Sequence, residues 1–303
     1  MKRRDCRSRG STLMLALWAL ILLSAVVFAW VKWIDRSIDA MSEANRGMEA
    51  RALAHSGVAV AMHPGVGQQS PHLTAQFERG QSYKVTIESE GGRLNLNYLL
   101  AGGDPLKIAI FKQYLALHGL TVQEREAFTD CLLDWVSPGG GVRRLNGVPE
   151  SAEYRLPHRP LQSLDEIALI AGSGPLVSQR GWKDDLTLYS SGPLDLESVS
   201  PELLALVPGI GEQRAQRFVK IREEYLSRKE AKDGHPFKNF AEALSCLGVS
   251  QDQFAQLPGF LGFRDPILRI TSVGESGKVA RQVDAIVRKV PGGNAQILLW
   301  SEK

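Results

Sequence analysis

Residues 12 to 31 form an uncharged, almost wholly apolar run, TLMLALWALILLSAVVFAWV, which constrains the chain more than any other feature. The run is as long as the ~20 residues that a helix needs to cross a hydrocarbon core about 30 Å thick. The charged residues before it are Lys2, Arg3, Arg4, Asp5, Arg7 and Arg9. Because positive charge stays on the cytoplasmic side of a membrane, we expect a cytoplasmic amino end and an exported remainder.

Three interpretations of this segment are open. A cleaved secretory signal would have a shorter apolar core followed by a small-x-small site, whereas Lys32-Trp33-Ile34-Asp35 follows here. A plain signal anchor fits the hydropathy alone. The third interpretation is a leader of the type IV prepilin kind, in which a short basic peptide ending in a glycine, here Gly10, is removed on the cytoplasmic side and the apolar helix is kept.

The helical pattern continues beyond the apolar run. Apolar residues recur three or four apart with charged residues between them, as in an amphipathic helix. The positions are Ile34, Ile38, Met41, Met48 and Ala52, with Asn45 in the same series. Proline is absent before Pro64, and Gly47 and Gly57 are the weak points. We predict one helix from Ser11 to about Met62, roughly 75 Å long, whose second half packs on its own domain or against sister helices.

The composition gives little support for catalysis or nucleic-acid binding. The formal net charge of +3 is smaller than the charge of the basic leader, so the exported part is near neutral. The histidines lie in predicted loops or near helix ends, without a paired nucleophile or metal spacing. They are His55, His63, His72, His118, His158 and His235. We therefore predict no enzyme and no catalytic residues.

The cysteines do not suggest a metal site, because no CxxC or Cys/His cluster is present. Cys6 lies in the leader, whereas Cys131 and Cys246 lie in apolar helical patterns. These two either pair in an oxidising compartment or stay buried as free thiols.

Strand patterns occur on both sides of a long helical region. Residues 82–90 alternate between polar and apolar side chains, whereas residues 62–81 are predicted to be a loop rich in Gly and Pro. The ranges 267–273, 279–290 and 295–300 are typical of an antiparallel meander. Since a lone hairpin is only marginally stable, we expect the first strand to pair with the meander. The predicted class is α+β: a long N-terminal helix plus antiparallel sheet, with a large mainly α-helical domain inserted between the strands.

Residues 95–260 are expected to be mainly helical. Helices are predicted over 107–118 and 121–136, the second with Thr121 and Glu124 spaced as in a capping box. The ranges 161–172, 198–209 and 237–248 are approximate copies of one pattern: a capping residue, an acidic first turn, an apolar stripe and a final glycine.

The range 203–222 has the signature of a helix-hairpin-helix. Pro208, Gly209, Ile210 and Gly211 are predicted to form the tight turn, with Ile210 inserted between the helices. The expected interhelical seam comprises Leu204, Val207, Ala215, Phe218 and Ile221.

In DNA-binding hairpins of this kind, the amides at the turn hold a phosphate. The basic residues that could assist here are Arg214, Arg217, Lys220 and Arg222. However, the range 201–240 holds eight Lys and Arg against six Asp and Glu, which is a mixed surface. Glu212 also lies where the phosphate would bind, so a structural role is favoured.

Several motifs follow one another in a characteristic order. After the leader, apolar helix and first strand come Gly-Arg-Leu-Asn-Leu-Asn (92–97), Leu-Leu-Asp-Trp (132–135), Ser-Leu-Asp-Glu-Ile (163–167), Leu-Tyr-Ser-Ser-Gly-Pro-Leu-Asp-Leu (188–196), Leu-Val-Pro-Gly-Ile-Gly (206–211) and the terminal strands. Over essentially its whole length, the chain resembles the minor pseudopilin K (GspK) family of type II secretion systems. The resemblance implies a pilin-like helix and sheet that carry an inserted α-domain.

The resemblance implies a structural role in protein export, at the tip of a short periplasmic pseudopilus whose assembly the protein helps to start. The implied partners are the I and J minor pseudopilins, the major pseudopilin, the prepilin peptidase and the inner-membrane assembly platform. The implied location is the bacterial inner membrane, spanned once, with the bulk of the chain in the periplasm. The domains would be a leader (1–10), a spine helix (11–62), a sheet region (63–92 and 265–303) and an inserted α-domain (93–264).

The family's processing chemistry maps onto the leader. Cleavage would fall between Gly10 and Ser11, with Ser11 as the new, N-methylated terminus. Major pseudopilins carry a Glu at the fifth mature position, where it can neutralise a neighbour's terminal amine. That position is Leu15 here, as is characteristic of the K family. Without this carboxylate the subunit offers no ion pair to a subunit above it, which suits the apex of a fibre.

Relatives of known fold bind calcium in the α-domain through clustered acidic residues. This chain has Asp134, with Glu150 and Glu153 further on, but Arg143 and Arg144 would oppose a cation. We therefore carry over no calcium site and expect Asp134 to cap the helix or to form local hydrogen bonds, while the resemblance leaves calcium open as a ligand. The alternative function is a membrane-anchored helix-hairpin-helix DNA receptor for DNA uptake. Such a receptor should carry a basic exported face, and it does not require strands after its hairpins.

Overall fold

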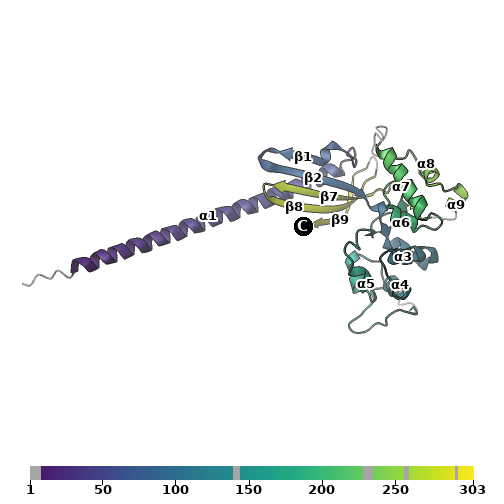
Figure 1. Cartoon of the computed structure of the whole chain (residues 1–303), viewed down its shortest axis with the longest axis horizontal. Helices are drawn as coiled ribbons and strands as arrows, with labels where there is room; N and C mark the ends of the chain where they lie inside the picture. Colours follow the sequence, from purple (N-terminus) through teal and green to yellow (C-terminus); the bar gives the residue numbers. More distant parts are fainter. Residues whose placement is uncertain (1–7, 139–143, 228–234, 256–258, 291–292) are drawn as a thin grey trace, which may run out of the picture.

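The computed structural model describes residues 8–138, 144–227, 235–255, 259–290 and 293–303. A single helix, α1 (Ser8–Met62), projects from a head that contains every other described element (Figure 1). The predicted continuous helix to Met62 is thus confirmed. Its apolar first part and amphipathic second part form one rod, because no proline interrupts the sequence before Pro64.

The head contains a five-stranded antiparallel sheet in the order β1-β2-β7-β8-β9. Its strands are β1 (Thr74–Phe77), β2 (Gln81–Ser89), β7 (Ile267–Ser276), β8 (Val279–Arg288) and β9 (Gln296–Glu302). The strand before the helical region pairs with the C-terminal meander along its full length, from Gln81↔Ser276 to Ser89↔Leu268. The predicted pairing and fold class are confirmed.

The prediction that residues 62–81 form only a loop is wrong. This range contains β1 and two single-turn 3₁₀ helices, η1 (Pro71–Leu73) and η2 (Glu78–Gly80). Strand β1 has four residues, pairs only with β2 and is mostly exposed. A strand this short and exposed has no apolar alternation to reveal it, so pairing with β2 defines it.

The C-terminal part of α1 packs on the sheet through small residues. Ala54, Val58 and Ala61 are buried in a core with the apolar side chains of β2, β7 and β8, and Ala50 is also buried. Gly274 on β7 allows the close approach: a Cβ there would lie 2.1 Å from the carbonyl oxygen of Ala50. The helix and sheet backbones therefore lie in direct contact.

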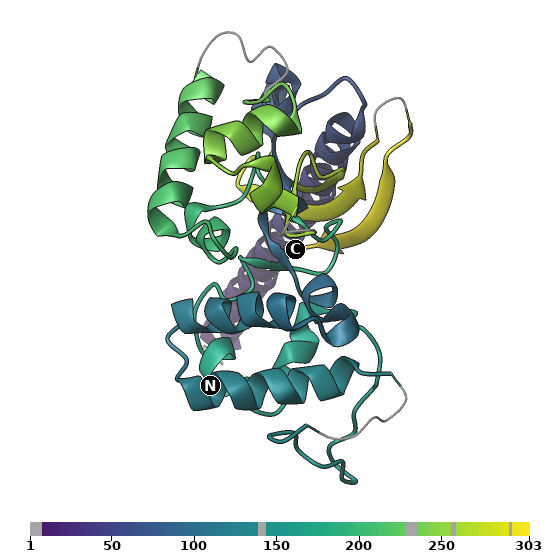
Figure 2. The ribbon, with the colours of Figure 1, turned by 90° about the vertical axis from the view of Figure 1, so that its right-hand side faces the viewer.

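The part between β2 and β7, here called the α-domain, has its own core and covers the far end of the sheet (Figures 1 and 2). Its helices are α2 (Leu96–Leu100), α3 (Pro105–Leu117), α4 (Val122–Val136), α5 (Gly174–Val177), α6 (Pro201–Ala205), α7 (Glu212–Ser227), α8 (Phe240–Leu247) and α9 (Gln251–Ala255). Its 3₁₀ helices are η3 (Glu90–Gly92), η4 (Ala101–Gly103) and η5 (Leu164–Leu169). Figure 2 shows α7 and α8 at one end of this domain and α3 and α4 at the other.

Two short parallel strand pairs hold the α-domain together. Strand β3 (Leu94–Asn95) pairs with β4 (Leu186–Thr187), and β5 (Leu194–Asp195) pairs with β6 (Leu261–Gly262). The sequence patterns did not predict these two-residue strands, because so short a run carries no periodicity.

The local helix signals are reproduced in the structure. Thr121 and Glu124 form the predicted capping box at the start of α4. The three repeated patterns each end in a glycine with positive φ, namely Gly172, Gly209 and Gly248. The first copy, however, forms the 3₁₀ helix η5 rather than an α-helix. The second copy forms the α-helix α6, which is shorter than η5, so segment length does not explain this difference.

Candidate functional site: the exposed helix and its joints

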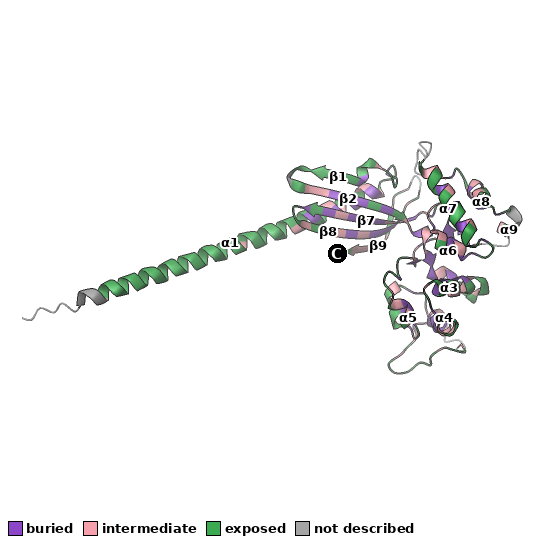
Figure 3. Cartoon of the chain, in the orientation of Figure 1, coloured by how far each residue is buried: buried purple, intermediate pink, exposed green. Residues whose placement is uncertain are grey.

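The amino-terminal part of α1 lies outside the head and is exposed to its surroundings (Figure 3). Among the described helices, α1 has the length and composition to cross a membrane, with a mean hydropathy of 2.5 in its most apolar window. Soluble monomers rarely expose apolar patches above a few hundred Å². We infer that this part of α1 is covered by lipid or by other apolar helices.

A second exposed surface continues along α1 towards the head. Four apolar residues, Ile34, Ile38, Met41 and Met48, are exposed in series with Asn45 and Ala52, and these six residues are called the exposed stripe below. Their steps alternate between four and three residues, which is the heptad pattern of helices that pack side by side.

The exposed stripe and the sheet lie on opposite faces of α1. Buried Ala50 and Ala54 follow Met48 and Ala52 by two residues each, which is about 200° around the helix. One face of α1 therefore belongs to its own head, and the other is available to a second helix.

The predicted processing residues lie at the start of α1. Gly10 and Ser11 are in its first turn, and the side chain of Leu15 is 68% exposed about one turn later. Residues 1–7 of the leader lie outside the described residues. The roles of Gly10, Ser11 and Leu15 stay predictions.

Polar contacts attach the last strand to α1. Arg51 Nη2 lies 2.7 Å from Glu302 Oε2, and His55 Nε2 lies 3.1 Å from Glu302 Oε1. The Trp300 indole also donates to Glu302, and its ring packs edge-on against His55. The Trp300 hydrogen bond, helped by Arg51 and His55, lowers the pKa of Glu302. The C-terminal strand is thus fastened directly to the helix.

Lys289 completes the carboxyl end of α1. Its ammonium group donates to the carbonyl oxygens of Ala61 at 3.1 Å and Val66 at 2.5 Å. A positive charge here satisfies an unpaired helix carbonyl and opposes the negative end of the helix dipole. Burial lowers the pKa of Lys289.

The joint between sheet and α-domain contains three buried carboxylates, beginning with Glu90 at the end of β2. Glu90 is completely buried and pairs with Arg93 at 2.8 Å and Arg269 at 2.6 Å. The Thr187 hydroxyl donates to its other oxygen. Arg269 comes from the strand where the chain re-enters the sheet, so Glu90 connects the exit and the return of the chain.

Asp195 and Asp265 form the rest of the joint. Asp195 accepts hydrogen bonds from the Ser89 hydroxyl and from the backbone amides of Glu197, Arg264 and Asp265. Asp265 accepts from the amide and hydroxyl of Ser191. Burial raises the pKa of Asp195, despite its hydrogen bonds from backbone amides.

Two of the motifs that carry the family resemblance, 92–97 and 188–196, meet at this joint. Arg93 and Asn95 of the first motif contact Glu90 and the Ser190 carbonyl, respectively, and Ser191 and Asp195 belong to the 188–196 motif. The sequence pattern indicated the two motifs but not the contact between them, because the contacting residues Asn95 and Ser190 lie 95 residues apart in the chain. Their role in the structure is to join the two parts of the head.

The predicted hairpin is present between α6 and α7. Gly209 and Gly211 have positive φ after Pro208, and Ile210 is buried with Leu204, Val207, Ala215 and Phe218 in the α-domain core. Ile221, the remaining seam residue, is half-buried.

The suggestion that Arg222 could hold phosphate is wrong. Arg222 is buried, and its guanidinium donates to the carbonyl oxygens of Leu196 at 3.1 Å and Val199 at 2.7 Å. Arg214 donates to Gly209 O, and Glu212 is exposed at the start of α7. The geometry supports a packing role for the hairpin and gives no support to DNA binding.

The acidic residues of the α-domain do not fit a calcium ion. In the described ranges, no group of three or more His, Cys, Asp and Glu side chains is placed to hold a metal. Asp134 is paired with Arg144, and Glu150 accepts from the Leu156 amide. Arg143 lies outside the described residues.

The two described cysteines are free thiols, which answers the question left open by the sequence. Cys131 is buried and donates to the carbonyl oxygen of Asn146, whereas Cys246 is partly buried. Burial raises the pKa of the Cys131 thiol.

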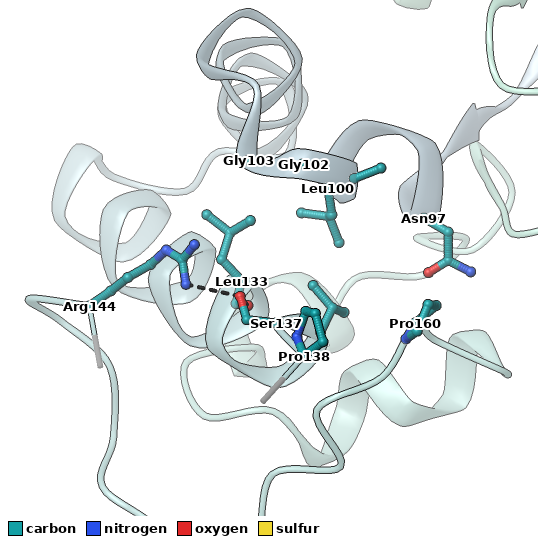
Figure 4. Close-up of a pocket in the computed structure, with 11 residues that line it drawn as sticks. Asn97, Leu100, Gly102, Gly103, Leu133, Ser137, Pro138, Arg144 and Pro160 are labelled. Carbon is teal, nitrogen blue, oxygen red and sulfur yellow. Dashed lines mark hydrogen bonds between the residues drawn. The ribbon is translucent and has the colours of Figure 1, made fainter. Parts of the chain in front are cut away.

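A cavity of about 490 Å³ lies between the α2–η4 segment and the end of α4. Figure 4 shows Asn97 and Pro160 on one side and Arg144 on the other, hydrogen-bonded to Ser137. Asn97 is occupied by two hydrogen bonds to the backbone of Leu161. Because these polar groups are engaged within the chain, we assign no ligand to the cavity.

Comparison with known proteins gives one consistent result. No family model matches the chain. The type II secretion system protein K of Pseudomonas aeruginosa is 25% identical over 172 residues, which cover 53% of this chain and 50% of that protein. The chain therefore matches about half the length of this relative.

The fold comparison covers much more of the chain. A chain in the crystal structure of the GspK-GspI-GspJ complex from the enterotoxigenic Escherichia coli type 2 secretion system has a TM-score of 0.58 and 13% identity. The match covers 89% of this chain and 99% of that one. The sequence comparison confirms the resemblance predicted from the motif order, and the structural comparison confirms the fold that this resemblance implies.

Proposed function

We propose that this chain is a minor pseudopilin of the K type in a type II secretion system. It would act as a structural subunit at the tip of the pseudopilus and help to start assembly during protein export. The resemblance of the motifs and both comparisons support the family. The arrangement of α1 supports a structural role, since it presents an apolar rod to its surroundings.

The observation that carries the proposal is the two-sided character of α1. One face is buried on the sheet at Ala50 and Ala54, whereas the exposed stripe has no cover in the described residues. A helix anchored in the bilayer with a free heptad stripe is suited to pack beside parallel helices with the same anchor.

The proposed partners are the I and J minor pseudopilins and the major pseudopilin, with the assembly platform and the prepilin peptidase acting in the inner membrane. The proposed location is the inner membrane, with the head in the periplasm. Removal of residues 1–10 would leave Ser11 as the mature terminus. The proposed domains keep the boundaries predicted from the sequence.

The proposed place at the apex rests on Leu15 and on the bulk of the α-domain. An apolar residue at this position gives no buried ion pair to a subunit above. The large α-domain, attached to the sheet through the joint of buried carboxylates, would widen the fibre at one end only. Labelling of the head in electron micrographs of pseudopili should therefore mark a single end; labels along the shaft would contradict the proposed tip position.

Site-specific cross-linking tests the assembly face. In a background without Cys6, Cys131 and Cys246, cysteines at Ile38 and Met41 should cross-link to partner helices in secreting cells. Cysteines at the matched positions Asp39 and Glu43, which are exposed but outside the stripe, should cross-link much less. Equal cross-linking at all four positions would argue against a defined assembly face.

A loss-of-function test addresses the proposed system. Deletion of the gene should stop secretion by the type II pathway, and the full-length chain should restore it. The chain should also copurify with the I and J subunits from detergent extracts. Normal secretion in the deletion strain would contradict the proposed function.

A further inference from the structure

We propose that the residues of this chain do not fit the calcium ion that the family resemblance implies for the α-domain, and that the guanidinium of Arg144 supplies the positive charge that Asp134 requires. The α-domain would then reach and keep its shape without a divalent cation. The inference goes beyond the proposed function and does not depend on the position of the subunit in a fibre.

The first step is the pairing of Asp134. This carboxylate lies in the last turn of α4 with only 7% of its side chain exposed. Arg144 Nη1 donates to its Oδ1 at 2.8 Å, and the Arg144 backbone amide donates to its Oδ2 at 3.1 Å. A buried carboxylate requires a compensating charge, and one residue here supplies both a cation and an amide.

The same guanidinium also reaches the end of the helix. Nη1 lies 3.3 Å from the hydroxyl oxygen of Ser137, the residue that follows α4 (Figure 4). Arg144 thus connects the helix, the segment after it and its own backbone. A bound cation would connect separate parts of a loop in the same way.

A second carboxylate on the same helix face has a similar arrangement, but its hydrogen-bond donors are neutral groups. Asp130, four residues before Asp134, accepts from the Asn146 amide at 3.2 Å and from Asn146 Nδ2 at 2.8 Å. The Cys131 thiol donates to the carbonyl oxygen of Asn146. Hydrogen bonds within the protein therefore hold residues 144 and 146 on α4.

The remaining oxygens do not complete a calcium shell. Calcium takes six to eight oxygen ligands. Of the nearby acids, Glu150 accepts from the Leu156 amide at 2.8 Å, and Glu153 is exposed. A calcium ion at Asp134 would also meet the positive charge of Arg144 on the same oxygen. The donor set suits arginine, whose planar group can contact a carboxylate and a hydroxyl together.

Calcium dependence of the full-length protein in detergent tests the inference. After treatment with EGTA, the unfolding temperature should be the same, within about 1 °C, in the chelator and in 1 mM calcium chloride. Calorimetric titration with calcium chloride should show no saturable binding. An unfolding temperature several degrees higher in calcium, or saturable calcium uptake by the wild-type chain, would overturn the inference.

Substitution of the cation supplies the second measurement. Arg144→Met should lower the unfolding temperature in both buffers and speed amide exchange at residues 144 and 146. Arg144→Lys, which keeps the charge, should lie closer to wild type, and Arg217→Met on exposed α7 should behave as wild type. An Arg144→Met protein that matches Arg217→Met would overturn the inference. If Arg144→Met does not fold, the calcium measurements on the wild-type chain still decide the question.

Discussion

Gly274 is the position where the smallest substitution should have the largest effect on this fold. It lies in β7, directly beneath the C-terminal part of α1. A Cβ at this position would lie 2.1 Å from Ala50 O and 2.4 Å from Ala54 N, whereas ordinary contacts of a Cβ are 3.4–4 Å. Both opposing atoms are helix backbone, so no side chain can rotate away.

In a Gly274→Ala protein, α1 must therefore move away from the sheet by more than about 1 Å, which opens the contacts of Ala54 and Val58 with the core. Overpacking of a core costs about 1–3 kcal/mol and occasionally more. Because the obstacle is backbone, we expect a loss near ~3 kcal/mol in the free energy of unfolding of the head. At roughly 2–4 °C per kcal/mol for a domain of this size, the unfolding temperature should fall by about 6–12 °C.

The assay is thermal unfolding of the detergent-solubilised full-length protein, followed by near-ultraviolet circular dichroism. Gly67→Ala is the matched control, since a Cβ at Gly67 would have nothing within 4 Å and its φ is ordinary. The control should unfold within ~0.5 kcal/mol of wild type. If Gly274→Ala and Gly67→Ala unfold at the same temperature, the direct contact of helix and sheet backbones is refuted.

Three further predictions follow from other contacts. Gly57→Ala should destabilise the head, since a Cβ would lie 2.3 Å from Ser272 Oγ. Ser272→Ala should relieve part of this loss, because the buried Ser272 hydroxyl has no hydrogen-bond partner among the described residues. Additive effects in a double-mutant cycle would contradict this. The pKa of Glu302 is lowered in the folded protein. Its contribution to the stability of the contact between β9 and α1 should therefore be complete above the usual carboxyl pKa of about 4.3, and it should be lost as the pH falls through the lowered pKa. The measurement is the rate of hydrogen exchange of the β9 amides relative to the β2 amides at each pH. In the wild-type protein this relative rate should rise in acid, whereas in Glu302→Gln it should be high already at neutral pH and should not depend on pH. An equal relative rate in both proteins at every pH would refute the contact of β9 with α1. Intact-mass spectrometry of the membrane protein should give a chain that begins at methylated Ser11, and Gly10→Val should retain the leader; any other amino terminus would remove the case for prepilin-type processing.

The joint between the sheet and the α-domain explains why some of the motifs that carry the family resemblance have particular residues. Arg93, Asn95, Ser191 and Asp195 belong to motifs that are far apart in the sequence, yet all contribute to the joint of buried polar groups. Buried charges are costly unless each is paired. A joint of this kind therefore restricts residue identity at many positions at once, even where no chemistry is performed.

The sequence alone determined the features that depend on neighbouring residues. The length and hydropathy of α1, the strand patterns of the meander, the capping box at Thr121 and the glycine turns at Gly209 and Gly211 are all local, because periodicity and turn chemistry act over a few residues. The pairing of the first strand with the meander was also predictable, since a lone hairpin is only marginally stable.

The tertiary structure decided what depends on partners distant in the sequence. Strand β1 exists because β2 lies beside it, and Gly57, a weak point for an isolated helix, is a point of contact between α1 and the sheet. Arg222 looked like an exposed cation but is buried against carbonyl oxygens, and Arg144 looked only like an obstacle to calcium but is the partner of Asp134. Burial and pairing are properties of the folded environment, so no local pattern could assign these roles.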